Sequence, residues 1–306
     1  MELINEAVYE YISQYVDPQD ILKNEPMSRH TTFCVGGEAE AFLRIRNKEQ
    51  LEKLIPYFKL AELPYFVIGN GSNLLVGDKG YRGVILQIFK KMNQIRVEEN
   101  KIYAGAGALL SKIAAAALAD SLTGFEFAAG IPGTLGGAVR MNAGAYGGEM
   151  KQVLESVEVM TADGEFLTIP VEEMGLAYRT SVVEQKNYIV LEAVISLEKG
   201  NPEKIKEVMD DLKEKRVTKQ PLEYASAGST FKRPEGYFAG KLIEDAGLRG
   251  FRVGDAQVSE KHCGFVINRG NASAAEVMEL MRQVEDKVEE NSGVRLEAEV
   301  RRIGEF

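Results

Sequence analysis

The sequence predicts an α+β protein of about two to three domains. Three observations indicate this. The chain has 306 residues, more than one small hydrophobic core usually holds. Its first two thirds mix β-rich runs with amphipathic helical stretches that are joined by short connections. A boundary follows at Gly200-Asn201-Pro202, where a helix cap precedes a proline suited to the first helical turn. We therefore expect domains at residues 1–88, 89–200 and 201–306.

Each element of the first two domains is predicted by a local pattern. Apolar residues at helical spacing predict a surface helix over Ile4–Val16 and a second helix over Glu49–Leu60, interrupted or restarted at Pro56. The alanine-rich stretch Leu109–Leu122 predicts a third helix. Alternating or β-branched runs predict strands at Ala41–Ile45, Tyr65–Ile68, Gly83–Ile88, Lys101–Ala104, Leu154–Met160, Phe166–Ile169 and Tyr188–Leu197.

The third domain is predicted to contain two helices and a final strand. The first helix follows Pro202, and its apolar stripe consists of Ile205, Val208, Met209 and Leu212. The second spans Asn271–Asn291, with a capping box made by Ser273 and Glu276 and a C-cap at Gly293. Its buried stripe is Val277, Leu280, Met281, Val284 and Val288. Strands are expected at Phe265–Asn268 and at the end of the chain, Val294–Ile303.

The composition excludes several classes of function. The net charge of −9 and the absence of a Lys/Arg run argue against a nucleic-acid partner. Cys34 and Cys263 are far apart and only two histidines are present, so we expect reduced, buried thiols, structural histidines and no metal site. No apolar run approaches the roughly 18 residues of a membrane span, and the acidic N-terminus lacks a secretory signal. We therefore expect a cytoplasmic protein.

Clustered glycines give the first indication of a ligand site, because they mark backbone that turns tightly or approaches another group closely. The apolar run Tyr65–Ile68 leads into Gly69-Asn70-Gly71-Ser72-Asn73. Small residues there let backbone N–H groups face an anion, and Ser72 and Asn73 add side-chain donors. Leu74 takes the place of the third glycine of a Rossmann fingerprint. On its own, the segment fits a phosphate cradle and an ordinary strand-to-loop turn about equally.

A second glycine-rich stretch, residues 124–147, is long, apolar and almost uncharged. A solvated loop of this length would normally be polar. Close packing against a large planar or extended ligand suits this composition better than its alternative, a buried helix with tight glycine packing.

Two further segments carry polar side chains whose roles the pattern leaves open. Ser229 follows a glycine, but no Gly-x-Ser-x-Gly context surrounds it, so a hydrolase triad is not indicated and a turn or cap residue is the simpler interpretation. Strand alternation in residues 295–301 places Glu297 and Glu299 on one face with Arg295 and Arg301. This face is typical of a solvated surface, and the alternation does not distinguish the two glutamates.

Taken together, these motifs resemble the UDP-N-acetylenolpyruvoylglucosamine reductase family. The similarity runs from Ser28-Arg29-His30-Thr31-Thr32-Phe33 to Glu299-Val300-Arg301 and so covers nearly the whole chain. Its most specific parts are Gly69-Asn70-Gly71-Ser72-Asn73-Leu74-Leu75, Ala129–Gly137 and Met141–Gly147.

The resemblance implies a vanillyl-alcohol-oxidase/PCMH-type FAD-binding fold of two α+β subdomains, followed by an α+β substrate-binding domain. It also implies reduction of UDP-N-acetylglucosamine enolpyruvate to UDP-N-acetylmuramate by NADPH through non-covalent FAD, in peptidoglycan precursor synthesis, by a monomer. The residues that match cofactor-binding positions are Gly69, Asn70, Gly71, Ser72, Asn73, Gly130, Pro132, Gly133, Gly136, Gly137, Asn142 and Gly144.

Catalytic roles are implied for three residues. Arg179 matches the arginine that grips the substrate carboxylate, Ser229 the proton donor and Glu299 the catalytic glutamate. The serine hydroxyl is a weak acid, so we expect support from a cation, Lys232 or Arg216, or from a water chain. Substrate contacts are implied for Tyr146, Lys232 and Arg301.

The chain departs from some relatives at Arg233, where they carry asparagine. It also lacks one branch's substrate-covering loop, because the region between Tyr178 and Gly200 is short; it resembles the shorter, second type. The alternatives are another FAD oxidoreductase of this fold, acting on a small alcohol or sugar, and a flavin- or nucleotide-binding module without turnover.

Overall fold

The computed structural model describes residues 3–306, which form two compact units. Unit 1 contains the chain up to Lys23, then Ala41–Asn70 and Gly83–Arg216; unit 2 contains Asn24–Glu40, Gly71–Arg82 and Val217–Phe306. Each unit has its own hydrophobic core. The three domains expected from the sequence stay a prediction, because each unit interleaves segments from more than one of them.

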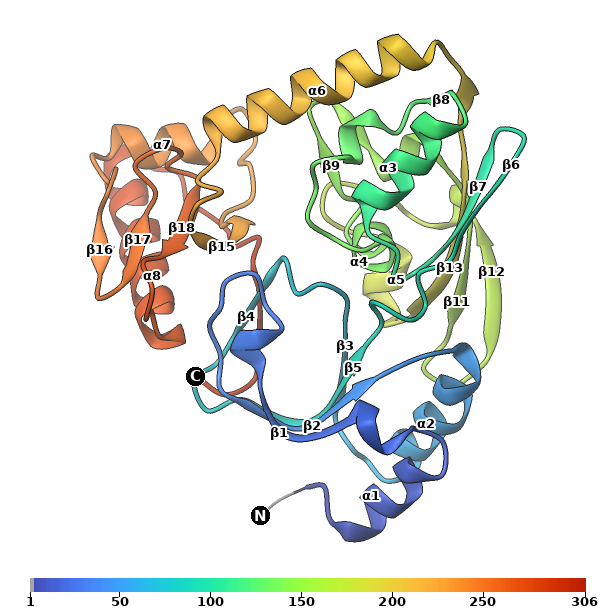
Figure 1. Cartoon of the computed structure of the whole chain (residues 1–306). Helices are drawn as coiled ribbons and strands as arrows, with labels where there is room; N and C mark the ends of the chain where they lie inside the picture. The colour runs from blue at the N-terminus through green and yellow to red at the C-terminus, as the bar shows by residue number, and fades with distance from the viewer. Residues whose placement is uncertain (1–2) are drawn as a thin grey trace. The chain divides into compact units, whose positions relative to one another are not determined.

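Unit 1 contains a five-stranded antiparallel sheet in the order β12-β11-β13-β7-β6 (Figure 1). The central strands β11 and β13 consist mostly of apolar residues, and these side chains are buried in the core of the unit. The strands are β6 (Ile95–Glu98), β7 (Lys101–Gly105), β11 (Leu154–Met160), β12 (Phe166–Pro170) and β13 (Ile189–Ser196).

Short helices and hairpins pack on this sheet and present the glycine-rich stretch. Helix α4 contacts β13 and α5, and helix α3 contacts β6, β7 and β8. The helices are α3 (Leu110–Ala119), α4 (Leu135–Arg140) and α5 (Val182–Gln185). The paired short strands are β8 (Leu122–Thr123) with β14 (Glu198–Lys199), and β9 (Gly144–Ala145) with β10 (Gly148–Glu149).

A second sheet has the order β1-β2-β5-β3, with β3 and β5 parallel. Its strands are β1 (Ile21–Pro26), β2 (Glu38–Arg44), β3 (Tyr65–Ile68) and β5 (Tyr81–Gln87). Strands β1, β2 and β5 begin in one unit and end in the other.

Two helices near the start of the chain have side-chain caps. Helix α1 (Glu6–Ser13) is capped by Asn5 and helix α2 (Lys48–Leu60) by Asn47. The expected interruption at Pro56 is wrong, because α2 runs through it. Pro56 lies on the exposed face of the helix, where water can bond the carbonyl left without an N–H partner.

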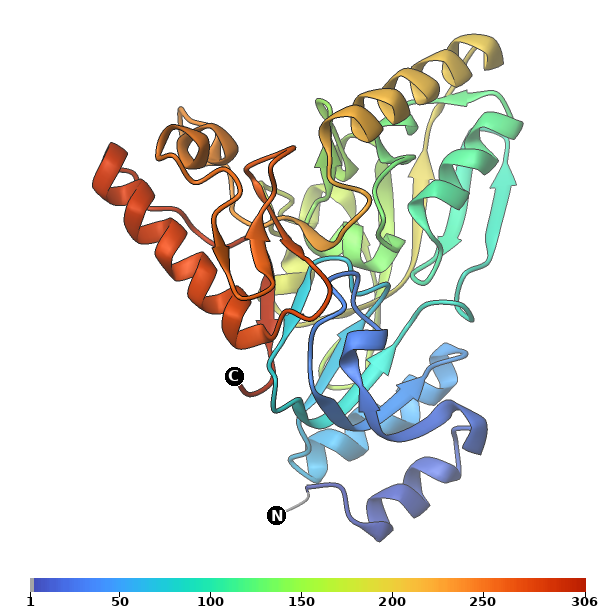
Figure 2. The ribbon, with the colours of Figure 1, turned by 60° about the vertical axis from the view of Figure 1, so that its left-hand side comes forward.

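Unit 2 is built on a four-stranded antiparallel sheet in the order β15-β18-β17-β16. Helix α8 (Ala274–Ser292) runs along one face of it, as Figure 2 shows, and buries the predicted stripe. Both predicted ends are confirmed: Ser273 and Glu276 form the capping box, and Gly293 adopts the left-handed conformation with φ 71°. The other elements are α7 (Ala239–Asp245), β15 (Ala225–Ser229), β16 (Arg252–Val253), β17 (Ala256–Val258) and β18 (Phe265–Asn268).

The final strand is shorter than expected. Only β19 (Arg301–Ile303) is regular, and it pairs in parallel with β4 (Leu74–Val76). Residues 294–300 do not form the predicted strand, because apart from one bridge from Ala298 to Phe231 they join no ladder. Their alternation persists, since Leu296 and Val300 are buried while Glu297 is exposed.

Helix α6 (Pro202–Lys219) begins where the sequence predicts. Its cap is Asn201, whose side-chain oxygen accepts from the backbone N–H groups of Glu203 and Lys204. The predicted apolar stripe is only partly right, because Ile205 is buried whereas Val208 is 46% exposed. Most of the helix surface is solvated, and its many charged residues suit that position. Over residues 3–306, no helix combines the length and hydrophobicity that crossing a bilayer requires.

Candidate flavin and substrate site

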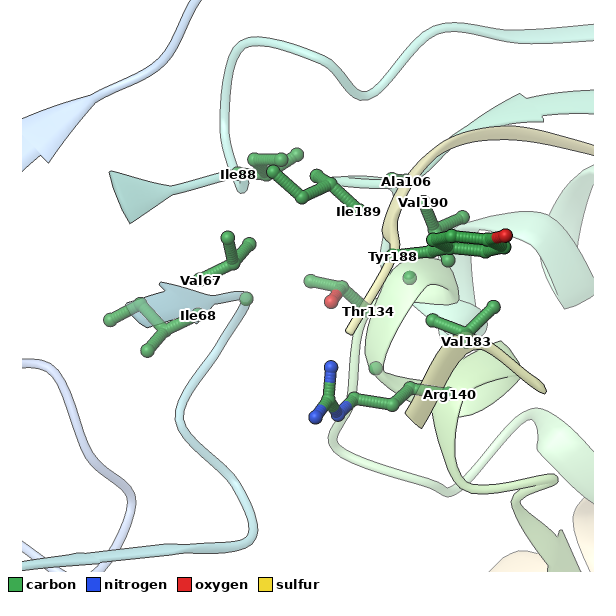
Figure 3. Close-up of a pocket in the computed structure, with 13 residues that line it drawn as sticks. Val67, Ile68, Ile88, Ala106, Thr134, Arg140, Val183, Tyr188, Ile189 and Val190 are labelled. Carbon is green, nitrogen blue, oxygen red and sulfur yellow. The ribbon is translucent and has the colours of Figure 1, made fainter. Parts of the chain in front are cut away.

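Unit 1 contains a pocket beside the first glycine cluster. Figure 3 shows Val67 and Ile68, from β3, on one side and Thr134 and Arg140 on the other. The cavity volume is about 60 Å³, whereas sites that enclose a small molecule usually exceed about 300 Å³. The pocket can therefore hold one end of a large ligand rather than the whole of it. The remaining lining residues are Gly69, Ile88, Ala106, Gly136, Gly137, Val183, Tyr188, Ile189 and Val190.

Close packing explains two of the predicted cofactor-binding glycines. A Cβ on Gly69 would lie 2.1 Å from Thr134 Oγ1, and one on Gly136 would lie 3.1 Å from the Cβ of Ala106. Gly137 differs, because it is exposed and its Cβ would meet only Thr134 Oγ1, at 3.7 Å. Gly69 and Gly136 thus shape the wall of the pocket, whereas Gly137 leaves the backbone open to an entering group.

The two glycine-rich segments are joined within unit 1. The side-chain amide of Asn70 donates to the carbonyl oxygen of Pro132 at 2.6 Å. Gly130 lies against Arg216, since a Cβ on it would be 3.2 Å from both Cδ and Nη1 of that side chain. Burial lowers the pKa of the Arg216 guanidinium, and Tyr146 opposes this shift. Gly133 instead serves the fold, because its carbonyl oxygen accepts from the backbone N–H at the start of α3.

Arg179 lies at the tip of a tight turn in unit 1. Ala177 and Thr180 exchange two backbone hydrogen bonds of 3.2 Å each, which close the turn around Tyr178 and Arg179. Arg179 has the left-handed φ of 57°, and its guanidinium carbon lies 5.0 Å from the centre of the Tyr178 ring. The turn leaves the Arg179 side chain half-exposed.

Tyr146 occupies a similar position in the β9–β10 hairpin. Gly144 pairs with Glu149 and Ala145 with Gly148, so Tyr146 and Gly147 form the tip. The tyrosine has φ 54° and is 47% exposed. Gly144 has no room for a side chain, because a Cβ on it would lie 2.6 Å from the carbonyl oxygen of Gly148.

Unit 2 brings Ser229 and Glu299 onto neighbouring segments. Ser229 ends β15 and pairs with Phe265 of β18. The next residue, Thr230, donates its N–H to the carbonyl oxygen of Gly264 at 2.9 Å and accepts the N–H of Glu299 at 2.8 Å. Thr230 is 3% exposed, and its hydroxyl oxygen accepts the N–H of Val266 at 2.9 Å. This buried residue therefore fixes the backbone of both predicted catalytic side chains.

The environments of Glu297 and Glu299 differ, although the sequence pattern does not separate them. The Glu297 side chain is 74% exposed and pairs with Lys232 Nζ at 3.2 Å. Glu299 is half-buried beside Thr230. Lys232 is therefore engaged with Glu297 in this structure.

The second half of the first glycine cluster belongs to unit 2. Gly71 has φ 64°, and a Cβ on it would lie 2.0 Å from the carbonyl oxygen of His30, so only glycine fits. The side-chain amide of Asn73 donates to the carbonyl oxygen of Glu299 at 3.2 Å, and the Asn73 carbonyl accepts the N–H of Arg301 at 3.0 Å. Ser72 is half-buried between them in the chain.

Arg233 is held by the segment that follows it. Its Nε donates to the carbonyl oxygen of Tyr237 at 3.2 Å, and its guanidinium carbon lies 4.0 Å from the centre of the Phe238 ring. Tyr237 and Phe238 are themselves exposed. The guanidinium group of Arg233 therefore stacks on the ring of Phe238.

The two cysteines differ in their exposure, and each histidine makes a hydrogen bond within the protein. Both cysteines are free thiols; Cys263 is buried as expected, but Cys34 is exposed, so that part of the prediction is wrong. Cys34 has φ 56°, and its N–H donates to the carbonyl oxygen of Thr31 at 3.2 Å, so it ends a tight turn and not a core strand. His30 bonds Glu25 at 2.8 Å, and His262 Nδ1 accepts the N–H of Gly264 at 3.1 Å.

Comparison with known proteins decides the family. Residues 220–303 match a family model described as the C-terminal domain of UDP-N-acetylenolpyruvoylglucosamine reductase, and residues 39–170 match an FAD binding domain. The reductase of that name from Agathobacter rectalis is 52% identical over 99% of this chain and 100% of its own length. The one from Caldanaerobacter subterraneus subsp. tengcongensis is 50% identical over 98% of this chain and 99% of its own.

The chain belongs to the UDP-N-acetylenolpyruvoylglucosamine reductase family. The crystal structure of the Thermus caldophilus reductase agrees, with a TM-score of 0.80 and 37% identity over 92% of this chain and 98% of that one. The family resemblance read from the motifs is thus confirmed, and so is the predicted flavoprotein fold with its C-terminal α+β domain. The protein is an FAD-dependent oxidoreductase.

The residues of this reductase fit part of a flavin nucleotide. The matched FAD-binding domain, residues 39–170, includes both glycine-rich segments and nine of the thirteen residues that line the pocket. Gly137 offers open backbone at the pocket, and apolar side chains such as Val67 and Val190 suit a planar ring edge. Bound FAD would bring hydride chemistry to these residues.

Sequence analysis missed Thr230, whose role in this fold is to hold the backbone of other residues. The reductase motifs name Ser229 and Glu299, but the residue that ties their backbones is Thr230. Its tie to Val266 lies 36 residues away in sequence. The sequence offers no clear signal for this, because Thr230 stands between Ser229 and Phe231-Lys232 and its burial arises only from tertiary packing.

Proposed function

We propose that this chain reduces UDP-N-acetylglucosamine enolpyruvate to UDP-N-acetylmuramate with NADPH through bound FAD, as a monomer in the cytoplasm, in peptidoglycan precursor synthesis. The observation that carries the proposal is 52% identity over 99% of the chain to a relative named for reduction of this enolpyruvyl sugar. The motif resemblance at Arg179, Ser229 and Glu299 adds to it.

The chemistry divides between the cofactor and the chain. FAD would supply hydride transfer from NADPH to the terminal vinyl carbon. The adjacent carbon must then gain a proton, so that the vinyl group becomes the methyl-bearing carbon of the lactyl ether. Negative charge builds on the substrate carboxylate between these events, and the chain's residues act on that charge and that proton.

Arg179 is proposed to hold the carboxylate. Its planar guanidinium can donate two parallel hydrogen bonds, and the closed turn from Ala177 to Thr180 restricts where the side chain begins. Restricting the position of a cation before the reaction lowers the cost of reorganisation when charge develops.

Ser229 is proposed as the proton donor and Glu299 as the group that supports it. Thr230 holds both backbones, with its N–H on Gly264 and its carbonyl on the N–H of Glu299. A protonated Glu299, or one next to a cation, would stabilise the developing charge instead of repelling it. Tyr146, Lys232 and Arg301 are proposed as substrate contacts.

The test follows NADPH absorbance anaerobically with FAD-loaded protein. The expected result is consumption of one NADPH for each enolpyruvyl sugar added, and, without the sugar, only the single equivalent that reduces the bound flavin. Flavin reduction that never passes to the sugar would contradict the proposed substrate while leaving the family intact. Ser229→Ala should leave flavin reduction by NADPH unchanged and slow flavin oxidation by the sugar by about 10²- to 10⁴-fold. Equal losses in both half-reactions would contradict the role of Ser229.

A further inference from the structure

The Asn142 side chain, in the second glycine-rich stretch, is used entirely within the protein. The residue is 1% exposed, and its Oδ1 accepts the backbone N–H of Lys151 at 2.9 Å. Its Nδ2 donates to Glu149 Oε2 at 3.1 Å and to the carbonyl oxygen of Ala177 at 3.3 Å. Because the Lys151 group can only donate and the other two can only accept, these partners fix which atom is nitrogen.

The two groups that receive these hydrogen bonds lie at the bases of two turns. Glu149 pairs with Gly144 at the base of the hairpin whose tip is Tyr146-Gly147. Ala177 is bonded to Thr180 at the base of the turn whose tip is Tyr178-Arg179. One buried amide thus joins the hairpin that carries Tyr146 to the turn that carries Arg179.

The Arg179 turn is clamped on its other side as well. Ser181, which is 0% exposed, donates its hydroxyl to the carbonyl oxygen of Arg140 at 2.6 Å. Arg140, the last residue of α4, and Asn142 are two residues apart, so one short segment at the end of this helix bonds to both Ala177 and Ser181, on either side of the turn.

Backbone conformation adds an independent sign of constraint. Asn142, Tyr146 and Arg179 have φ values of 44°, 54° and 57°, in the left-handed region that side-chain-bearing residues seldom adopt. Each costs about 1 kcal/mol or more and persists only where the surroundings enforce it. The hydrogen bonds of Asn142 are such surroundings.

We infer that Asn142 is a positioning residue that sets the Arg179 turn and the Tyr146 hairpin in one frame, and through them the grip on the substrate carboxylate. The effect of Asn142 on the grip of the substrate carboxylate rests on the proposed function. Its effect on the positions of the turn and the hairpin does not. The inference gives Asn142 a role different from the cofactor contact that the sequence motif implies, because its amide atoms are already bonded within the protein.

The test compares Asn142→Gly with Asn100→Ala. Glycine keeps the left-handed backbone of position 142 and removes only the side chain. Asn100 is a matched control, since its Nδ2 bonds a distant carbonyl, that of Leu197 at 3.1 Å, in the same unit. Asn142→Asp serves as a third variant, because it places a carboxylate against the Glu149 carboxylate and the Ala177 carbonyl.

The first measurement is amide hydrogen exchange at residues 177–181, which needs no activity. We expect Asn142→Gly and Asn142→Asp to speed exchange there by about tenfold or more, and Asn100→Ala to leave it unchanged. If Asn142→Gly is too unstable to purify, Ser181→Ala opens the other clamp and should speed the same exchange. Unchanged exchange in every purified variant would overturn the inference. This result is independent of which substrate the enzyme uses.

The second measurement is single-turnover oxidation of reduced flavin by the enolpyruvyl sugar. We expect Asn142→Gly to slow it by about 10- to 100-fold with FAD affinity and NADPH reduction unchanged, since small misplacement of a gripping residue is costly. Adding Arg179→Ala should then cost far less than it does in the wild type, because the two changes affect one interaction. Full additivity, or loss of FAD affinity, would overturn the positioning role. If the reduced flavin of the wild type is not oxidised by the sugar, the proposed function is contradicted, but the hydrogen-exchange result still tests the structural role of Asn142.

Discussion

The side-chain amide of Asn73 bonds the backbone carbonyl oxygen of Glu299 at 3.2 Å, across 226 residues of sequence. The return bond, from the N–H of Arg301 to the carbonyl of Asn73 at 3.0 Å, leads into the parallel pair β4–β19. The second half of the glycine-rich loop, Gly71–Asn73, and the proposed catalytic glutamate are thus one structural assembly within unit 2. A residue in a loop that resembles a flavin phosphate site therefore also determines where Glu299 lies.

Asn73→Ala is expected to slow substrate-dependent flavin oxidation more than flavin reduction by NADPH. Loss of one hydrogen bond costs about 1 kcal/mol, and the Glu299 carbonyl would lose a fixed partner. Stopped-flow traces of the two half-reactions measure this, with FAD affinity determined alongside. Ser72→Ala is the comparison, since it removes a candidate phosphate donor and leaves the hydrogen bond from Asn73 to Glu299 in place. Loss of FAD affinity alone in Asn73→Ala, equal to that in Ser72→Ala, would mean that Asn73 serves only the cofactor.

Glu299→Gln and Glu297→Gln should have very different effects, although the two residues share one face of the chain. Glu297 is exposed and its ion pair with Lys232 contributes at most about 1 kcal/mol, so its replacement should change turnover less than about twofold. Glu299→Gln should reduce the substrate half-reaction by about 10² or more, if it supplies a proton or stabilises charge. The rates of sugar-dependent flavin oxidation decide between them. Comparable losses in both variants would remove Glu299 from its proposed role.

The sequence predicts regular elements best where one pattern is long and its ends have their own chemistry. Strand β11 matches the prediction residue for residue, and α8 has both its capping box and its left-handed Gly293. The prediction failed for residues 294–300, because alternation reports which side chains face the core and not whether a partner strand exists. The predicted interruption at Pro56 failed for a similar reason. Helix propensity does not take into account that water can bond the carbonyl left without a partner on an exposed helix face.

The motifs also predict which residues belong to the candidate site better than what those residues do. Resemblance names Arg179, Ser229 and Glu299, and it names Asn142 only as a cofactor contact. It does not show that Asn142 and Thr230 make hydrogen bonds to residues 35 and 36 positions away. Such partners depend on tertiary packing, which no local pattern contains. The exposure of Cys34 has the same origin, because composition gives only the average burial of a thiol.

Gly137→Ala separates cofactor binding from folding in the pocket of unit 1. Glycine inside α4 is about 1 kcal/mol less favourable than alanine, and the new Cβ would meet only Thr134 Oγ1 at 3.7 Å. The free energy of unfolding of the apoprotein should therefore stay equal or rise, while FAD affinity falls because the Cβ occupies space beside the open backbone. Denaturant titration and flavin titration measure the two quantities.

Gly69→Ala is the contrasting variant, because its Cβ would lie 2.1 Å from Thr134 Oγ1 and must destabilise the fold itself. Thr134→Ala should restore part of that stability.

An unchanged FAD affinity in Gly137→Ala would mean that the cofactor does not approach this wall of the pocket.

His262 should make the stability of the protein depend on pH on the acid side of neutrality. Burial lowers the pKa of this imidazole below its usual 6.5, and Arg249 and Lys219 add to the shift. The unfolded chain then binds a proton that the folded chain does not, so stability is fully present above about pH 6.5 and declines as the pH falls toward the folded pKa. Protonation also removes the acceptor that Nδ1 offers to the N–H of Gly264, at 3.1 Å.

His262→Gln tests this, since glutamine retains an acceptor but does not titrate. Denaturant midpoints from pH 7.5 to pH 5 should fall more steeply for the wild type than for the variant. Because Gly264 also bonds Thr230, acid should weaken the support of Ser229 before global unfolding, which hydrogen exchange at Thr230 would reveal. Parallel pH profiles for the two proteins would show that another group, not His262, carries the acid sensitivity.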